Sequence, residues 1–371
     1  MPSSEPVPIR PEVSIIIPAR NEELSLGPCL ASLVSQRGVD FEIIVVDDDS
    51  SDRTREIALS FPGVQVVDPP ALCDDWTGKN NAVFAGARHA AGNWLLFTDA
   101  DTIHLPGSLT RSLAEARRTG AALLSYSPEQ DVQTFWEKAV MPVIFAELAS
   151  TYRPSEVSDP TSPAAAANGQ YLLISREAYD ATGGHAAIAG EILEDVALAR
   201  LVKKSGRKIH FRYAADAVRT RMYRNFAQLR EGWVKNLALL FDDPDQLARR
   251  RAAEFLLIAA SGGLALEAAA HRRPKTAAAA ATVAAFAYAF HRKRIRKAHF
   301  SSQSNLLALL GLPLFSYLLR RSKLSHSEGQ ISWKGRSYGA RRDSATSNEL
   351  NPASDQQSGP MEISSPKASG M

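Results

Sequence analysis

The chain has 371 residues, of which 45% are hydrophobic and 22% are charged, with a formal net charge of +3. This composition is that of a globular protein, and the length leaves room for one large catalytic domain or two smaller ones. The two cysteines, Cys29 and Cys73, exclude a disulfide scaffold and a thiolate metal site. Residues 1–11 are polar and contain no long apolar stretch, so we expect a flexible N-terminus without a cleaved secretion signal.

The basic residues are distributed unevenly. They concentrate between residues 249 and 342, in Arg249-Arg250-Arg251, Arg272-Arg273, Arg292-Lys293-Arg294 and Arg320-Arg321. Such asymmetry indicates an anionic partner surface near the C-terminal part, either a membrane or a nucleic acid. Because apolar segments alternate with these clusters, we expect a membrane partner and no nucleic acid.

Strands and helices alternate along the first hundred residues. Apolar strands are predicted at 13–18, 42–46, 64–67 and 95–97, and helices at 19–36, 53–60 and 80–90. This rhythm predicts an α/β protein with a parallel, doubly wound sheet. No G-x-G-x-x-G follows the first strand, which leaves a Rossmann dinucleotide site unsupported.

Two carboxylates, Asp99 and Asp101, follow the strand at Leu95–Phe97 directly. The carboxyl edge of a parallel sheet is where ligands bind, and residues i and i+2 of an extended chain point to the same side. Paired carboxylates there suit Mg²⁺ or Mn²⁺ carrying a diphosphate. A loop with two solvated acids also fits so short a motif. Lys79 is a candidate phosphate contact, although a solvated lysine at a helix start explains it equally well.

Four ordered motifs within the first 101 residues resemble family 2 glycosyltransferases of the GT-A fold. They lie at 13–23, 45–54, 78–82 and 97–101, the last being the Asp-x-Asp motif. The resemblance implies a nucleotide pocket, a metal site and a nucleoside diphosphate sugar as donor, with uracil the expected base. It assigns Pro18, Arg20 and Glu22 to the pocket, Asp48 to the base, Lys79 to the diphosphate, Asp101 to the metal, and Asp99 to the ribose or a metal-bound water.

A second acidic pair, Glu194-Asp195, opens an apolar helical pattern, where the helix dipole favours negative charge. Ordinary charge at a helix start is one explanation. The resemblance implies instead that Asp195 is the catalytic base and that Glu194 lies near the acceptor or the diphosphate. An inverting sugar transfer needs one carboxylate to take the proton of the acceptor hydroxyl, unlike a glycosidase, which uses a pair.

The region after residue 102 is expected to build the acceptor half. Predicted elements are a helix at 105–120, strands at 121–126 and 171–175, and a loop at 153–167. The aromatic stretch 135–145 fits core packing or a membrane interface. Gln228, Arg230 and Trp233 have the residue types, but not the spacing, of the Gln-x-x-Arg-Trp motif in the membrane-associated branch of the family. Arg230 and Trp233 remain possible acceptor or diphosphate contacts, and the departure argues against assuming a processive polysaccharide synthase.

Three apolar runs occupy 255–270, 276–290 and 305–319, each shorter than the roughly twenty residues of a typical membrane span. Helices of a soluble bundle are one explanation, but the basic clusters favour membrane association. We expect an even number of crossings, or interfacial helices, that return residues 331–338 to the catalytic side. The Ser- and Asn-rich tail beyond 340 is expected to be disordered.

The expected organisation is a flexible segment 1–11, a GT-A domain 12–245, membrane-associated helices 246–322, a basic segment 323–340 and a tail 341–371. The GT-A domain divides into a nucleotide-sugar half, 12–102, and an acceptor half, 103–245. The whole resembles bacterial lipid-directed members of family 2, such as hopanoid- and carotenoid-associated glycosyltransferases. It implies an inverting transfer of one sugar from a UDP-sugar to a lipid at the cytoplasmic membrane face. The alternatives are a polysaccharide or other non-lipid acceptor, and a nucleotide-sugar-binding protein without turnover.

Overall fold

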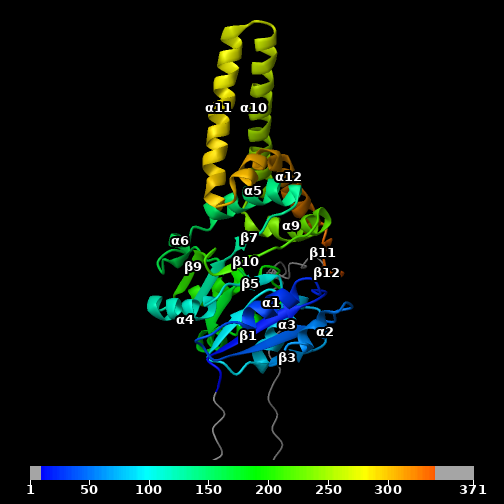
Figure 1. Cartoon of the computed structure of the whole chain (residues 1–371), viewed down its shortest axis with the longest axis vertical. Helices are drawn as coiled ribbons and strands as arrows, with labels where there is room; N and C mark the ends of the chain where they lie inside the picture. The colour runs from blue at the N-terminus through cyan, green and yellow to red at the C-terminus, as the bar shows by residue number, and fades with distance from the viewer. Residues whose placement is uncertain (1–9, 339–371) are drawn as a thin grey trace, which may run out of the picture.

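The computed structural model describes residues 10–338, so most of the expected flexible segment 1–11 and all of the tail 341–371 lie outside the described residues. A seven-stranded sheet forms the lower body of the molecule in Figure 1, with the strand order β3-β2-β1-β4-β8-β6-β9. Its strands are β1 Val13–Ala19, β2 Phe41–Asp47, β3 Val64–Val67, β4 Trp94–Phe97, β6 Leu123–Ser127, β8 Leu172–Ser175 and β9 Ile209–Tyr213.

The sheet is mixed, and not parallel throughout as predicted. β1 to β4 are parallel, which confirms the prediction for the nucleotide half. β8 runs antiparallel to both of its neighbours, β4 and β6. The chain enters β8 from Asn168–Gln170, beside the carboxyl end of β4, and must therefore run back along the sheet. This reversal places the loop before β8 at the same edge as Asp99.

Helices cover both faces of the sheet. α1 Leu26–Val34 and α4 Ser108–Thr119 pack on the face that carries Ile15 and Ile17, while α3 Gly78–His89 and α8 Glu194–Lys204 pack on the face that carries Ile16. The alternation of β1 side chains between the two faces separates these cores. α1 begins at Leu26 and not near 19 as predicted, because a turn with Asn21 at a φ of 53° precedes it. α2 Thr54–Leu59 and α7 Arg176–Ala181 complete these layers.

A second helical layer lies between the sheet and the tip of the molecule. α5 Phe135–Thr151, α9 Phe226–Leu240 and α12 Ser302–Ser327 share one apolar core that includes Val143, Trp233 and Phe315. The third apolar run thus lies in a helix packed on the acceptor half. α12 approaches α5 so closely that a Cβ on Gly311 would lie 1.9 Å from the carbonyl oxygen of Ala139. Phe135 and Trp136, at the start of α5, are exposed, so the stretch 135–145 provides both core and surface.

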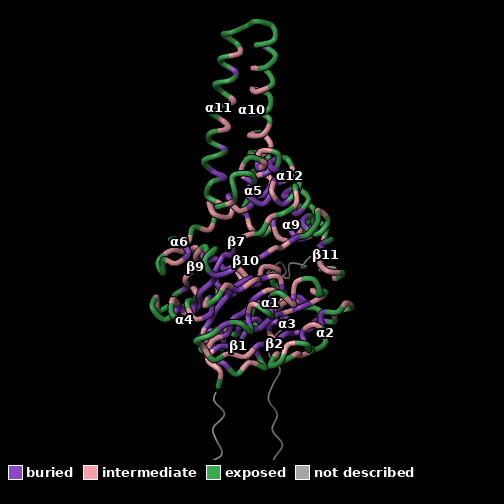
Figure 2. Tube along the Cα trace, in the orientation of Figure 1, coloured by how far each residue is buried: buried purple, intermediate pink, exposed green. Residues whose placement is uncertain are grey.

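The first two apolar runs lie in an antiparallel pair of long helices, α10 Pro244–Ala270 and α11 Pro274–Ile295, which project from this layer (Figure 1). Their outer parts are largely exposed, as Figure 2 shows. Within residues 10–338, α10 and α12 are the helices long and apolar enough to cross a membrane; the apolar part of α10 is largely exposed, whereas nearly half of that of α12 is buried. The expected domain boundary at 245 falls on the second residue of α10.

Shorter elements connect these layers. A small sheet contains β5 Thr102–His104, β10 Val218–Thr220 and β7 Glu129–Gln130, and a hairpin is formed by β11 Ile331–Trp333 and β12 Arg336–Tyr338. α6 Pro154–Ser158 lies inside the stretch 153–167, which was predicted as loop, because Pro154 can occupy the first turn of a helix. Two 3₁₀ turns, Gly184–Ile188 and Arg296–Ala298, precede α8 and follow α11.

Candidate active site

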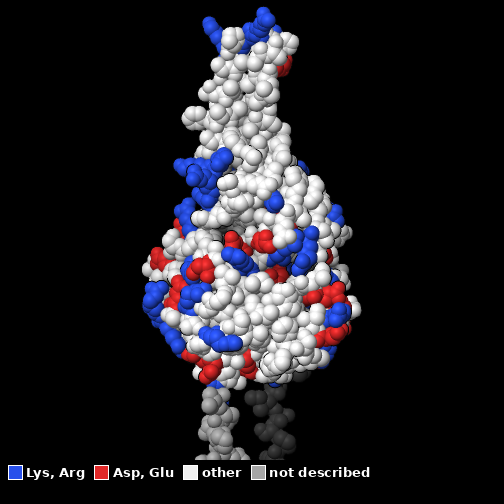
Figure 3. All heavy atoms as spheres, in the orientation of Figure 1, with Lys and Arg blue, Asp and Glu red and all other residues white. Residues whose placement is uncertain are grey.

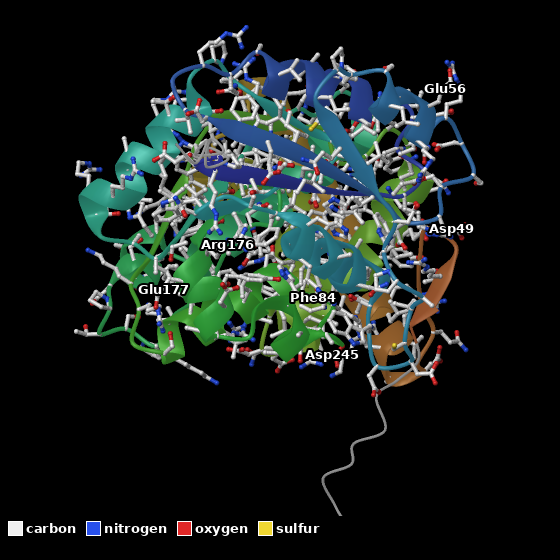
Figure 4. The ribbon with its side chains drawn as sticks, turned by 90° about the horizontal axis from the view of Figure 1, so that it is seen from below. Asp49, Glu56, Phe84, Arg176, Glu177 and Asp245 are labelled. Atoms are coloured by element: carbon white, nitrogen blue, oxygen red, sulfur yellow. The ribbon has the colours of Figure 1, made fainter. Side chains whose placement is uncertain are left out.

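A cavity of about 190 Å³ lies at the carboxyl ends of β1, β2 and β4. The predicted nucleotide-site residues Pro18, Arg20, Glu22, Asp48, Lys79, Asp99 and Asp101 all line it. Of the two acids directly after β2, Asp48 is buried, whereas the side chain of Asp49 is 91% exposed and lies at the outer rim in Figure 4. Asp49 has a φ of 59°, and this left-handed turn separates the two side chains.

The C-terminal hairpin β11–β12 forms a wall of this cavity. Lys334 pairs with Glu22, and the Nε of Arg20 donates to the carbonyl oxygen of Lys334 at 3.2 Å. Burial raises the pKa of Glu22, and Lys334 partly offsets this effect. The hairpin therefore joins the N-terminal strand across more than three hundred residues of sequence.

Arg336 engages the predicted base-binding residue, Asp48. Its two terminal nitrogens contact both carboxylate oxygens, with Nη2 donating to Oδ1 at 2.9 Å. The guanidinium packs so closely on the start of α3 that a Cβ on Gly78 would lie 1.9 Å from Nη1. The sequence analysis expected residues 331–338 on the catalytic side, but it assigned no role to Lys334 or Arg336.

Lys79, in the first turn of α3, lies between two carboxylates. Its Nζ is 2.8 Å from Asp99 and 2.6 Å from Glu194. Burial acts to lower the pKa of Lys79, but the two carboxylates outweigh it and hold that pKa well above its ordinary value. The structure thus brings together three predicted site residues, and the charge of Lys79 is already balanced by acidic partners.

Asp101 differs from Asp99 in that no basic side chain among residues 10–338 forms an ion pair with it. In the described chain, its Oδ1 has no hydrogen-bond partner, and burial, followed by the charges of Asp99 and Glu22, raises its pKa to about 7. A divalent cation would relieve this concentration of negative charge, so the donor chemistry of Asp99 and Asp101 fits Mg²⁺ or Mn²⁺. Within residues 10–338, no group of three or more His, Cys, Asp or Glu side chains could hold a metal. Two carboxylates together with substrate phosphates and water are a usual ligand set for Mg²⁺.

Asp195 lies in the first turn of α8, as predicted. It accepts backbone N–H bonds from Gly169 at 2.8 Å and from Val196 at 2.7 Å. Burial and the neighbouring Glu194 raise the pKa of Asp195 to about 6. The backbone of Gly169 passes so close that a Cβ there would lie 3.2 Å from Oε1 of Glu194 and 3.6 Å from Oδ2 of Asp195.

A second cavity, of about 180 Å³, opens around Asp195 and shares Lys79 and Asp99 with the first. Its apolar lining includes Phe145 and Leu148 of α5, Tyr152 directly after α5, and Trp233 and Leu240 of α9. Asp99 thus borders both cavities, the first lined by many charged side chains and the second by more apolar ones.

The two residues carried over from the membrane-branch motif lie apart. Trp233 is buried, lines the second cavity and donates its Nε1 hydrogen to Sδ of Met141 at 3.3 Å. Arg230 is exposed and lines a separate surface pocket beside Tyr317 and Arg321. The structure therefore brings Trp233, but not Arg230, to the site.

Sequence reasoning missed Lys235, two residues after Trp233 on α9. Lys235 lines both cavities, and its Nζ lies 5.1 Å from the centroid of the Trp333 ring. Burial lowers its pKa. Helical spacing from Trp233 alone could not have shown that this lysine points into the site.

A mixed α/β sheet with acidic residues at the carboxyl ends of β2 and β4 is the GT-A architecture that the motifs predicted. Residues 14–182 match the model of the family described as glycosyl transferase family 2. Residues 14–182, somewhat less than half of the chain, thus match the family that the motifs indicated.

Among curated proteins, the chain is similar to the 4,4'-diaponeurosporenoate glycosyltransferase of Staphylococcus aureus strain USA300. The two are 32% identical over 238 residues, which are 61% of this chain and 60% of the relative. The same enzyme from strain MRSA252 is 32% identical over 235 residues. The chain thus spans about 60% of the length of these relatives.

Among solved structures, the chain is similar in fold to a mannosyltransferase from Pyrobaculum calidifontis in complex with GDP-Man and Mn²⁺. The TM-score is 0.52 at 19% sequence identity, with 85% of this chain and 87% of the other covered. At this identity the likeness extends to the fold alone.

Proposed function

We propose that this protein is an inverting glycosyltransferase that moves one sugar from a nucleoside diphosphate sugar, with a UDP-sugar as the expected donor, to a lipid acceptor at the cytoplasmic face of the membrane. The observation that carries the proposal is the pair of adjoining cavities. Asp99 and Lys79 line both, Asp101 lies on the charged side and Asp195 on the apolar side. The family 2 domain and the relatives named as carotenoid glycosyltransferases support the same assignment.

The charged cavity is the proposed donor site. Pro18, Arg20, Glu22 and Asp48 are assigned to the nucleoside, and Asp99 and Asp101 to the divalent cation. Bound there, Mg²⁺ or Mn²⁺ would neutralise the diphosphate as a Lewis acid. The mannosyltransferase of similar fold was solved as a complex with Mn²⁺, which supports a divalent metal of this kind. In the described structure the Arg336 guanidinium is hydrogen-bonded to the Asp48 carboxylate. Donor binding at Asp48 therefore requires the guanidinium to move.

Asp195 is the proposed general base. Its carboxylate takes the proton from the acceptor hydroxyl while that oxygen bonds to the anomeric carbon and the bond between that carbon and the diphosphate oxygen breaks. Attack from the face opposite the leaving group inverts the configuration. The two backbone N–H bonds fix the orientation of Asp195, and a pKa of about 6 leaves the carboxylate ionised at neutral pH yet able to accept a proton. An acceptor carboxylate, if it is the nucleophile, would need no base.

The apolar cavity and the helices beyond it support a lipid acceptor. The second cavity leads from Asp195 to the aromatic and aliphatic side chains of α5 and α9. Beyond these helices, α10 and α11 expose large apolar side chains, including Leu256, Leu266, Phe286 and Phe290. An apolar acceptor cavity below exposed apolar helices fits a lipid better than a water-soluble acceptor.

The dimensions of the α10–α11 hairpin fit a bilayer. The rise from Arg251 at its base to Arg272 at its tip is about 30 Å, which equals the thickness of a hydrocarbon core. Figure 3 shows a column that is uncharged except for an acidic side chain near its tip, with basic side chains at both ends. We propose that residues 12–245 are the catalytic unit, and that of the segment 246–322 only α10 and α11 enter the hydrocarbon, while α12 stays packed on α5 and α9.

The experiment that tests this function is nucleotide release by the detergent-solubilised enzyme. Nucleotide sugars are offered one at a time with Mn²⁺, with and without a membrane lipid extract. The proposal expects release that the lipid extract stimulates and a chelator abolishes, with a glycolipid as product. Release stimulated only by a polysaccharide would replace the lipid acceptor, and donor binding without release to any acceptor would indicate a nucleotide-sugar-binding protein.

A further inference from the structure

The cations that line the donor cavity are, with one exception, matched by carboxylates. In the described part of the chain, Arg20 lies 3.6 Å from Asp49 and Lys79 lies 2.8 Å from Asp99, while Lys334 pairs with Glu22 and Arg336 with Asp48. No carboxylate lies within 4.0 Å of the Lys235 ammonium among residues 10–338, and no hydrogen-bond acceptor contacts it there. The cavity therefore contains one cation that no acidic neighbour neutralises directly.

The structure nevertheless holds Lys235 in place from two sides. Its carbonyl oxygen lies 2.8 Å from Nε2 of His326 on α12, which fixes the backbone of α9 at this point. Its ammonium lies over the ring of Trp333 in the C-terminal hairpin, at 5.1 Å from the centroid. A cation over an aromatic face is attracted by the ring, but it keeps its capacity to donate hydrogen bonds to an anion.

Retaining such a cation is unfavourable for the unliganded protein. Lys235 is half-buried, so its ammonium loses part of its hydration without gaining a full counter-charge, and this burial lowers its pKa. The nearby acids Glu194, Asp99 and Asp195 moderate this cost, while Lys79 increases it. A methionine would fill a comparable volume without the penalty. The arrangement is typical of a binding residue whose partner is a ligand.

We propose that Lys235 binds the diphosphate of the donor and stabilises that diphosphate as it leaves, with Trp333 as the positioning residue that holds its ammonium. This assignment rests on the proposed function. Lys79, the lysine predicted for that role, is already shared by Asp99 and Glu194, so its charge serves chiefly to balance the acids. As the bond between the anomeric carbon and the phosphate oxygen breaks, that oxygen gains charge, and a Lys235 N–H bond to the diphosphate strengthens.

The test compares the binding of a nucleoside diphosphate with that of the matching monophosphate, in the full chain with Mn²⁺, by calorimetry. UDP and GDP are both tried, and the tighter is used. Lys235→Met is expected to weaken diphosphate binding about ten- to hundredfold, because it removes a charge-assisted hydrogen bond, and to change monophosphate binding little. Lys235→Arg should retain most of the diphosphate affinity. Lys204→Met, at an exposed lysine on α8, is the matched control and should change neither.

Two further measurements separate binding from structure. Lys235→Met should unfold at the same temperature as wild type or a higher one, since it removes a desolvated cation. Trp333→Leu should reduce the preference for diphosphate over monophosphate, and should reduce it no further when combined with Lys235→Met, because both changes act through one ammonium.

The outcomes are distinguishable. If the wild-type chain binds diphosphate and Lys235→Met binds it equally well, or loses monophosphate binding by the same factor, the assignment of Lys235 is wrong and the proposed function stands. If the wild-type chain binds neither nucleotide, the proposed function fails and this assignment fails with it.

Discussion

Two adjacent carboxylates, Glu194 and Asp195, have opposite electrostatic environments. Burial acts to raise the pKa of both, but Lys79 at 2.6 Å outweighs burial at Glu194, whose pKa is lowered. At Asp195, burial and the charge of Glu194 outweigh the effect of Lys79, and the pKa rises to about 6. One acid thus stays charged to orient Lys79, and the other can accept a proton near neutral pH, a separation typical of catalytic carboxylates.

The first prediction concerns Asp195→Asn. This change should lower the transfer rate at least a hundredfold, roughly the contribution of a general base, and leave donor binding unchanged, because the amide keeps the shape but cannot take a proton. Turnover and donor affinity are measured together. Asp180→Asn, at an exposed acid on α7, should alter neither. If Asp195→Asn turned over at the wild-type rate, Asp195 would not be the general base.

The second prediction is the pH dependence of turnover. Because the raised pKa of Asp195 is about 6, its carboxylate is protonated below that pH and cannot act as a base. The rate constant at saturating donor and acceptor should therefore fall as the pH falls through about 6, and level off above about 7. The residual activity of Asp195→Asn should lack this acid limb. A wild-type rate that is flat between pH 5 and 8 would contradict the assignment for a hydroxyl acceptor.

The third prediction concerns metal dependence. Asp101→Asn should abolish chelator-sensitive activity and weaken Mn²⁺ binding in the presence of donor about tenfold or more, since it removes one of two carboxylate ligands. Paramagnetic resonance of free Mn²⁺ measures the binding directly. Asp131→Asn, whose side chain is exposed on the loop after β7, is the control. Unchanged Mn²⁺ binding in Asp101→Asn would show that the metal does not bind at the Asp-x-Asp motif.

At the scale of elements, the base of the α10–α11 hairpin is held by a cluster of charges. Glu254 on α10 lies 2.6 Å from Arg251, 2.9 Å from His291 on α11 and 2.5 Å from Arg294. Arg251 and Arg294 also reach Glu147 on α5, at 2.9 and 3.1 Å. Since α5 lines the cavity around Asp195, this cluster joins the hairpin to the proposed acceptor site.

The fourth prediction tests that junction. Glu254→Gln should lower the free energy of unfolding by about 3 kcal/mol, because buried arginines lose a counter-charge. Thermal unfolding in detergent measures the change. Glu267→Gln, at an exposed position on the same helix, should shift stability by less than about 0.5 kcal/mol. Equal unfolding temperatures for both variants would show that the cluster contributes no net stability.

The sequence predicted the elements best where apolar runs ended in acids. The carboxyl ends of β2 and β4, and the first turn of α8, lie where the motifs indicated. It failed where long-range pairing decided the outcome: the direction of β8, the packing of α12 on α5, and the hairpin that brings Lys334 and Arg336 to Glu22 and Asp48. The hairpin contacts join residues about 300 positions apart, the other two join residues tens of positions or more apart, and no local periodicity specifies any of them. Lys235 escaped notice for the same reason.

At the scale of the molecule, the α10–α11 hairpin and the two cavities suggest how the protein is oriented relative to a membrane. The donor cavity lies against the sheet, the apolar cavity lies between it and the helical layer, and α10 and α11 project beyond that layer (Figure 1). If the hairpin spans the bilayer, its tip, with Arg272, Arg273 and Lys275, lies on the face opposite the catalytic unit. Basic residues resist translocation, but those at the base of the hairpin outnumber those at the tip and favour this orientation.

The fifth prediction follows from that orientation and uses the two native cysteines. Cys29 is buried, and Cys73 is exposed on the catalytic unit, so it serves as an internal control. In intact cells, a membrane-impermeant maleimide should label Arg272→Cys at the tip and leave the wild-type chain unlabelled. After the membrane is opened, Cys73 should react in both. The exposed apolar side chains of α10 and α11 extend over about 30 Å, which matches the thickness of a bilayer core. Protection of residue 272 until the membrane is opened would place the hairpin along the cytoplasmic interface, and labelling of wild-type Cys73 in intact cells would place the catalytic unit outside.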